Sequence, residues 1–365
     1  MLRRSLMAMS GSARLRRFVA AAPYTRDVVA RFVAGETAAD AIEVTGRLRG
    51  DGLLVTLDHL GEDTTEPEHA AAAADEYIRL IEGLAEAGLT GLPGVTGLPG
   101  VIGLPGAVGL PGAVGLAGLP GVAEAVRPTV RLTAAPTAAP TMLPAIGGAE
   151  VSVKPTAVGL RLDAHGEKTA TGHIARIAAA ARAAGTTVTV DMEDYAAVEP
   201  TLRIVAELRT EFADLGCVIQ AYLRRAERDC EHLAGLGSRV RLCKGAYQAA
   251  GAVAFSSRHE IDRSYARCLA VLMAGRGFPM LATHDPRLIK IAFALATLNG
   301  RPAGTYEFQM LYGVSPAGQR RLAGSGAVVR VYLPYGNDWY GYLMRRLAER
   351  PANVMFFLRA LASRR

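Results

Sequence analysis

The segment TTVTVDMEDYAAVEPTLRIVAELRTEFADLGCVIQAYL, residues 186–223, carries a strand, a helix and a second strand in succession. Its first part, TTVTVDMED, is rich in β-branched residues and reads as a strand, and so does the closing run GCVIQAYL. Between them, residues 198–214 read as a helix. Strands that alternate with helices in this way favour a parallel sheet with helices packed outside it.

The same alternation extends from this segment in both directions along the chain. Helical segments follow each of the predicted strands, which lie at 53–62, 149–160, 186–194, 216–223, 239–247, 278–285, 305–313 and 327–336. Eight such units over about 250 residues match an α/β fold of the (β/α)8, or TIM-type, barrel class. The alternative, an open doubly wound sheet, is expected to carry a G-x-G-x-x-G turn after its first strand, and none is present.

A repeat interrupts this pattern over residues 90–147. Glycine occupies every third position from Gly88 to Gly121, twelve times in register, and a stretch rich in proline and threonine follows. Glycine at this period is typical of collagen, which needs three wound chains. The repeat lies between the helix 68–89 and the strand 149–160, and such loops of a barrel lie opposite its active site. We therefore predict a disordered, low-complexity insertion whose replacement leaves turnover intact. A collagen-like scaffold with an inactive barrel is the alternative.

Composition and net charge alone exclude few classes of protein. Half of the 365 residues are apolar, the net charge is +7 and the pI is about 9.4, which suits an anionic substrate, an acidic membrane or a nucleic acid. Basic and aromatic residues are not interleaved as in a nucleic-acid groove, so no nucleic-acid partner is expected. The four cysteines lack C-x-x-C spacing, which favours a reduced, cytoplasmic setting.

The amino-terminal region contains five arginines by residue 17 but no continuous apolar run of a signal peptide. We expect an N-terminal helical arm over 1–52, with a helix at 12–35, followed by a catalytic barrel over 53–365. No unbroken apolar run reaches the length of a membrane span.

Polar residues recur at the carboxyl ends of the predicted strands. In a barrel these ends converge on the active-site face. The residues concerned are Asp191, Glu193, Gln220, Lys244, Tyr247, His284, Asp285 and Tyr332. The chain has no H-x-x-x-H pair and no other metal-ligand spacing, so no metal site is predicted.

Eight motifs in order give the sequence a specific resemblance. They are EVSVKPTAVGL, VDMEDY, QAYLRR, RLCKGAY, ATHD, YEFQMLYG, RVYLPYG and WYGYLMRRLAERPAN. Together they closely resemble the monofunctional bacterial proline dehydrogenases, flavoenzymes that begin proline catabolism by oxidising L-proline to Δ1-pyrroline-5-carboxylate. The resemblance implies a distorted barrel, FAD as the hydride acceptor and a quinone as the electron acceptor. It also raises a downstream pyrroline-5-carboxylate dehydrogenase as a partner, and the basic amino-terminal arm suggests peripheral membrane contact.

The resemblance also assigns roles to individual residues. It makes Asp191 and Arg241 catalytic. It assigns the substrate to Lys154, Tyr247, Leu311, Tyr332, Tyr342, Arg345, Arg346 and Glu349, and the flavin to Met192, Gln220, Arg241, Lys244, Gly245, Ala246, Thr283 and His284. Paired guanidinium groups match the two oxygens of a carboxylate, and a cation beside a flavin stabilises its anionic reduced form.

The residues themselves leave alternatives open. Arg345 and Arg346 could be an ordinary solvated helix end paired with Glu349. Lys154 could be a Schiff-base lysine of an aldolase, Asp191 a helix cap, and His284 a packed core histidine. Hydroxyproline or another cyclic amino acid is the alternative substrate.

Overall fold

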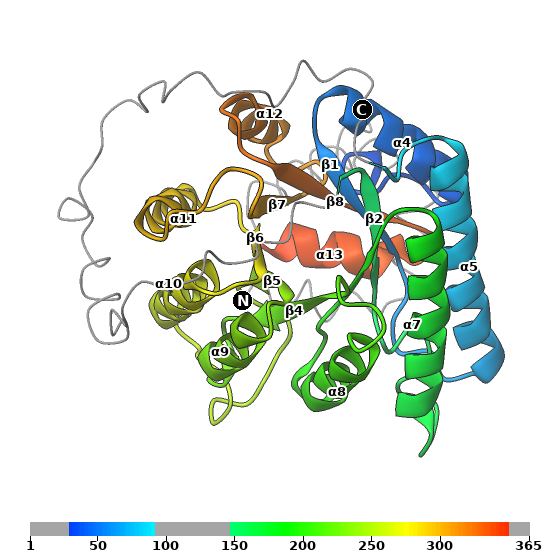
Figure 1. Cartoon of the computed structure of the whole chain (residues 1–365). Coiled ribbons are helices and arrows are strands. Elements are labelled where there is room, and N and C mark those ends of the chain that lie inside the picture. The colour runs from blue at the N-terminus through cyan, green and yellow to red at the C-terminus, as the bar shows by residue number, and fades with distance from the viewer. Residues whose placement is uncertain (1–28, 92–146, 350–365) are drawn as a thin grey trace, which may run out of the picture.

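A computed structural model describes residues 29–91 and 147–349, with side chains described as far as Met344. Eight parallel strands close into a barrel in chain order, which confirms the fold predicted from the sequence (Figure 1). The strands are β1 (Leu54–His59), β2 (Ala149–Val153), β3 (Val188–Val190), β4 (Gly216–Gln220), β5 (Arg239–Cys243), β6 (Phe278–Ala282), β7 (Glu307–Leu311) and β8 (Val329–Tyr335). Pairing of β1 with both β2 and β8 closes the ring.

A helix follows each strand, and most of these helices form the outer ring of the barrel. They are α5 (Pro67–Glu86), α7 (Gly166–Ala183), α8 (Val198–Leu208), α9 (Ala226–Gly235), α10 (Arg258–Ala274), α11 (Pro286–Leu298) and α12 (Pro316–Gly324). The last described helix, α13 (Trp339–Glu349), does not join the ring but lies across its centre in the view of Figure 1. Because α13 follows the end of β8 within a few residues, it lies at the carboxyl ends of the strands.

Strand β2 shows how the sequence separates the two layers of the core. Side chains alternate along a strand, so Val151 and Val153 pack in the main apolar cluster with the helices. Glu150, Ser152 and Lys154 point the other way, into the barrel, where they meet side chains of other strands. The predicted strand 149–160 is too long, because Pro155 has no N–H for the ladder and turns follow it.

The expected helix at 12–35 ends earlier than predicted. Residues 29–30 are helical, but residues 31–35 form turns and loop, and helix α4 (Ala38–Gly50) begins only after Thr37. Thr37 and Asp40 form a capping box that fixes this start. The segment before it is held to the end of β8, where Ala34 N–H donates to the Pro334 carbonyl at 2.9 Å. The rest of the predicted helix, residues 12–28, lies outside the described residues, and the arm-and-barrel division stays a prediction.

The two ends of the predicted insertion lie side by side. Ala149 N–H donates to the Leu89 carbonyl at 2.8 Å, so the chain leaves α5 and returns to β2 at one point. Gly148 has a φ of +80°, and a Cβ there would lie 2.2 Å from the Thr90 carbonyl oxygen, so only glycine fits. This point is at the amino end of β2, opposite the mouth. Residues 92–146 of the predicted insertion, and 350–361 of the predicted last helix, lie outside the described residues.

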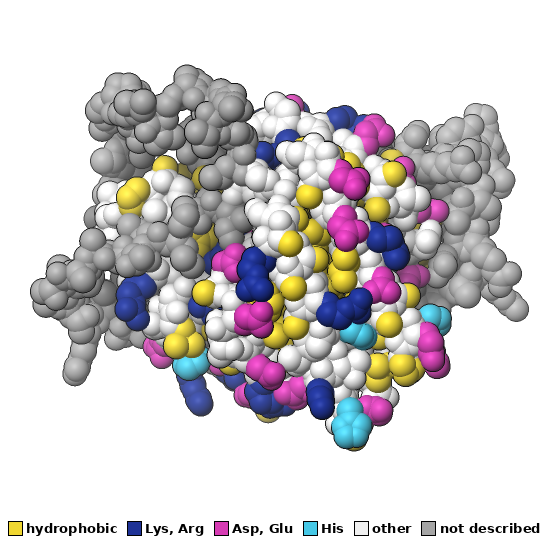
Figure 2. Space-filling view, turned by 45° about the vertical axis from the view of Figure 1, so that its right-hand side comes forward, with side chains coloured by type: hydrophobic (Ala, Val, Ile, Leu, Met, Phe, Trp, Pro, Cys, Tyr) yellow, Lys and Arg dark blue, Asp and Glu magenta, His cyan; other side chains and the backbone are white. Residues whose placement is uncertain are grey.

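The outer face that carries α5 and α7 mixes charges of both signs (Figure 2). Arg176 of α7 pairs with Asp75 of α5 at 2.7 Å, and Arg79 pairs with Glu76 at 2.8 Å. Among the described helices, none combines the length and the hydropathy that a membrane span requires.

Candidate active site

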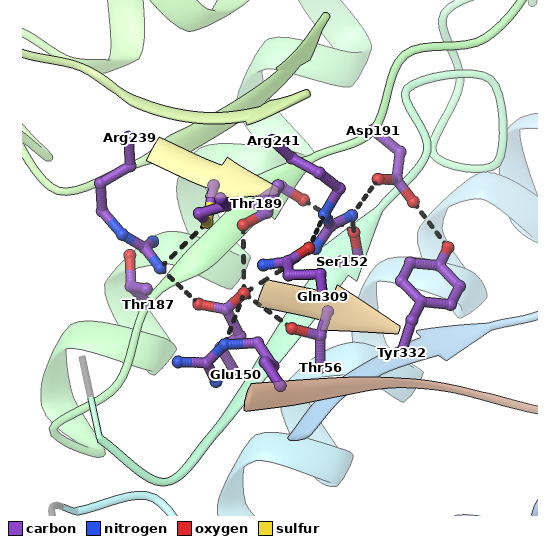
Figure 3. Close-up of polar contacts among 12 residues, drawn as sticks. Thr56, Glu150, Ser152, Thr187, Thr189, Asp191, Arg239, Arg241, Gln309 and Tyr332 are labelled. Carbon is purple, nitrogen blue, oxygen red and sulfur yellow. Dashed lines mark hydrogen bonds and ion pairs between the residues drawn. The ribbon is translucent and has the colours of Figure 1, made fainter. Parts of the chain in front are cut away.

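Two buried ion pairs lie at the carboxyl ends of the strands. Lys154, just past β2, donates to Asp58 Oδ1 of β1 at 2.5 Å. Asp191, just past β3, accepts from Arg241 Nη1 of β5 at 2.6 Å, and its other oxygen accepts from the Tyr332 hydroxyl of β8 at 2.8 Å (Figure 3). Each of the four charged residues in these pairs is less than a tenth exposed. The structure thus brings the two predicted catalytic residues, Asp191 and Arg241, into direct contact.

The Asp191 side chain is not a helix cap. The cap of the short helix that follows β3, residues 195–197, is Asp194, whose carboxylate accepts from Ala197 N–H. Asp191 instead uses both oxygens inside the barrel, for Arg241 and Tyr332.

A second layer of charge lies beneath this mouth and forms a floor of fully buried side chains. Glu150 binds Arg239 at 2.7 Å and Thr56 at 2.7 Å, and Arg330 binds Glu307 at 2.8 Å. Figure 3 shows the contacts of Glu150 with Arg239 and Thr56. The surrounding arginines hold the pKa of Glu150 down at about 2 even though burial acts against ionisation.

Arg241 joins the floor to the mouth. Besides Asp191, it donates to Ser152 Oγ at 2.8 Å and through Nε to Gln309 Oε1. Its Nη2 is buried and has no hydrogen-bond partner among the described residues, with Glu150 3.8 Å away. A charged donor in this state is suited to a bound acceptor.

The neighbouring carboxylates keep Lys154 charged. Burial alone would lower the pKa of Lys154, but Asp58 and Asp191 outweigh it, so that the pKa is raised. The same surroundings raise the pKa of the Tyr332 hydroxyl, which therefore remains a donor to Asp191.

Glu193 binds the loops together beside the mouth. Its carboxylate accepts from Thr156 N–H at 2.9 Å and from the Thr156 hydroxyl at 2.5 Å. The Glu193 carbonyl accepts from Gln220 Nε2 at 2.7 Å, which fixes that amide. Burial raises the pKa of Glu193 to about 7.

The segment after β5 contains one position, Gly245, whose backbone conformation and surroundings only glycine can accommodate. Gly245 has a φ of +100°, and a Cβ there would lie 2.1 Å from Cδ1 of the Tyr222 ring. Tyr222 and Met192 lie in one apolar cluster, and the buried Tyr222 hydroxyl has no partner among the described residues. Ala246 is exposed.

Lys244 is directed away from the barrel interior. Its ammonium pairs with Asp262 of α10 and lies 3.4 Å from Asp285, the N-cap of α11. Thr283 Oγ1 accepts from Asp285 N–H at 3.1 Å. His284 Nε2 accepts from Leu311 N–H at 3.0 Å, which makes this histidine a link between β6 and β7.

The other predicted substrate residues lie around the mouth. Tyr247 reaches across it, with its hydroxyl 3.4 Å from Glu62 Oε2 after β1. Tyr342 is buried on α13 with Phe32 and Leu60, and Leu311 is half-buried at the end of β7. The side chains of Arg345, Arg346 and Glu349 lie outside what the structure describes, although their backbone belongs to α13.

Sequence reasoning missed several residues of this site. They are Asp58, Ser152, Gln309, Glu62 and the floor residues Glu150 and Glu307. A signal was present, because polar side chains at alternate positions of an apolar strand must face a shared interior. Their partners could not be read from one sequence, since each contact joins different strands.

The described residues fit a flat polar cofactor at the mouth. Arg241 Nη2 and the Tyr222 hydroxyl are buried groups that lack hydrogen-bond partners among the described residues, and Gly245 has no side chain of its own, with the Tyr222 ring packed against it. An electron-poor heterocycle suits this set of groups, which consists of the Tyr222 hydroxyl, the fixed amide of Gln220 and the cation of Arg241.

Comparison with known proteins shows which family the chain is similar to. The family model described as proline dehydrogenase matches residues 41–359. Proline dehydrogenase 1 of Bacillus subtilis subsp. natto is 34% identical over 99% of each chain, and the proline dehydrogenase of Deinococcus radiodurans is 32% identical over 91% of this chain and 89% of its own. A crystal structure of proline utilization A (PutA) from Bdellovibrio bacteriovorus, inactivated by N-propargylglycine, has a TM-score of 0.69 at 24% identity and supports the fold. The match covers 89% of this chain and 33% of that one.

Proposed function

Because the chain belongs to the proline dehydrogenase family, we propose that it oxidises L-proline to Δ1-pyrroline-5-carboxylate with FAD as its cofactor. The observation that carries the proposal is the family match over residues 41–359. The buried contact of Asp191 with Arg241 at the carboxyl ends of the strands supports it, because active sites of such barrels lie at this face.

The substrate carboxylate is assigned to Lys154. An ammonium group has three donors, and Asp58 occupies one of those on Lys154, so that others are left for a ligand. Arg345 and Arg346 are proposed as the second, bidentate half of this clamp, with Glu349 holding them.

The substrate amine is assigned to Asp191. Proline arrives as an ammonium, which a carboxylate binds, and the nitrogen must lose a proton before its lone pair can form the C=N bond. Asp191 Oδ2 is the acceptor for that proton, and the Tyr332 hydroxyl donates to the same oxygen. The hydride then leaves from the ring carbon beside the nitrogen. The flavin, when bound, supplies the acceptor for that hydride.

Arg241, Lys244 and the glycine at 245 are proposed to hold the flavin, together with Met192, Gln220, Ala246, Thr283 and His284. Arg241 contributes a fixed positive charge that favours a reduced, anionic ring. Tyr247, Leu311, Tyr332 and Tyr342 are proposed to enclose the pyrrolidine ring.

Schiff-base chemistry at Lys154 is not favoured. A Schiff-base lysine must be available as a neutral amine. The carboxylates around Lys154 raise its pKa instead, which suits a binding cation.

The test is the absorption spectrum of purified protein. We expect a flavin spectrum that bleaches when L-proline is added without oxygen, and recovers when a quinone analogue is supplied. A colourless protein that cannot be reconstituted with FAD contradicts the proposed cofactor. Bleaching by 4-hydroxyproline in preference to L-proline would replace the substrate and leave the cofactor in place.

Quinone as the acceptor, a downstream dehydrogenase that consumes the product, and contact of the amino-terminal arm with a membrane surface are parts of the same proposal. Reduction of the quinone analogue without vesicles tests the acceptor, and a change in that rate when anionic vesicles are added tests the membrane contact.

A further inference from the structure

The floor of the barrel contains an uneven balance of charge. Arg239, Arg241 and Arg330 face the interior with Glu150 and Glu307. Arg239 lies 2.7 Å from Glu150, and Arg330 lies 2.8 Å from Glu307. The floor carboxylate nearest to Arg241 is Glu150, at 3.8 Å. In the part of the chain that the structure describes, the close carboxylate partner of Arg241 is Asp191, which belongs to the mouth.

A neutral side chain separates Arg241 from the other floor carboxylate. Gln309 lies two residues after Glu307 on β7, so both face the interior. Its Nε2 donates to Glu307 Oε1 at 2.6 Å, and its Oε1 accepts from Arg241 Nε. Gln309 is therefore a bridge between an anion and a cation that are not in contact with each other.

The two contacts fix the amide in one orientation. The reverse orientation would place the amide N–H groups against the guanidinium and the amide oxygen against the carboxylate, and both contacts would be repulsive. Glu307 is in turn held by Arg330, and all of these side chains are at most a few per cent exposed.

We infer that Gln309 is a positioning residue that holds Arg241 and, being uncharged, adds no second carboxylate to Arg241 on the side of the floor, where Glu150 lies 3.8 Å away. Asp191 then remains the one carboxylate in close contact with Arg241 among the described residues, and the charge of Arg241 sets the reduction potential of the flavin bound beside it. The inference rests on the proposed function, because it requires a flavin beside Arg241.

Two variants separate charge from position. The double variant Gln309→Glu with Glu307→Gln moves one carboxylate by two residues and leaves the net charge unchanged. Gln309→Met has a similar length but no acceptor for Arg241. Gln319→Met is the matched control, since Gln319 is also a buried amide but binds the Leu311 and Val314 carbonyls near α12.

The readouts are the midpoint potential of the bound flavin, by reductive titration against a reference dye, and the steady-state constants for proline. We expect the double variant to shift the equilibrium about tenfold against reduced flavin, which is about 30 mV for a two-electron couple. Gln309→Met should leave that equilibrium within about threefold of the wild type but lower kcat about tenfold with KM unchanged, because Arg241 loses its anchor. Gln319→Met should leave the potential unchanged.

A double variant that binds flavin at the wild-type potential overturns the inference about charge. If that variant does not bind flavin, Gln309→Met decides, and wild-type kcat in it overturns the positioning role. Wild-type protein that cannot be loaded with flavin overturns the proposed cofactor as well, so the two failures are distinguishable.

Discussion

The pKa of a single residue at this site depends on burial as much as on its partners, and Glu193 is an example that can be measured. Burial raises its pKa from 4.5 to about 7, so the folded protein binds a proton there that the unfolded chain has already lost. Because the folded state binds more protons between about pH 4.5 and 7, stability must fall as pH rises through this window.

We predict that Glu193→Gln removes this dependence. The wild type should lose on the order of 3 kcal/mol of unfolding free energy between about pH 4.5 and 8, given the shift to about 7, beyond the loss shown by the variant. Urea unfolding of both proteins across this range measures the difference. Parallel profiles for the two proteins would mean that Glu193 is ionised throughout.

Helices and strands depend on residues that close their ends. Arg301, which is buried, donates to the carbonyls of Leu272 and Met273 in the last turn of α10, and to those of Gly275 and Gly277 after it. These carbonyls lie at or beyond the end of the helix, where backbone donors become scarce, although the Leu272 carbonyl also accepts from Gly275 N–H. Buried carbonyls without donors are costly.

We predict that Arg301→Ala lowers the free energy of unfolding by about 3 kcal/mol or more, while KM for proline stays as in the wild type. Arg276→Ala is the control, because Arg276 is exposed and donates to the Gly235 carbonyl. It should cost less than about 1 kcal/mol. Equal losses in denaturant melts of the two variants would refute the capping role of Arg301.

The elements also show what one sequence could and could not predict. The eight strands were predictable because each is a short apolar run that ends in polar residues, as in TTVTVDMED. Their lengths were not, since β2 ends where Pro155 lacks an N–H. The sequence predicts Asp191 and Tyr332 at strand ends that share one mouth, and the structure brings them into contact. The sequence alone does not single out Asp58 and Gln309, because their importance lies in partners 96 and 68 residues away.

At the scale of the whole molecule, the described residues on either side of the insertion meet each other. The Leu89–Ala149 hydrogen bond joins its two ends on the face opposite the mouth. Closing a long loop costs more chain entropy than closing a short one, although the cost grows slowly with length.

We predict that a short Gly/Ser linker in place of residues 92–146 leaves kcat and KM unchanged and stabilises the protein by about 2 kcal/mol. Denaturant unfolding and proline turnover of the shortened protein check both parts. Loss of flavin from it would show that the replaced segment contributes to the site.

The closure of the barrel has one more consequence. Strand β1 is held by pairing with β2 on one side and with β8 on the other, and neither pairing depends on the covalent link through residues 92–146. A protease that cuts this link would divide the chain into a small piece with β1 and α5 and a large piece with β2 to β8. The pieces should remain assembled as one active particle, so the barrel can be built from two polypeptides.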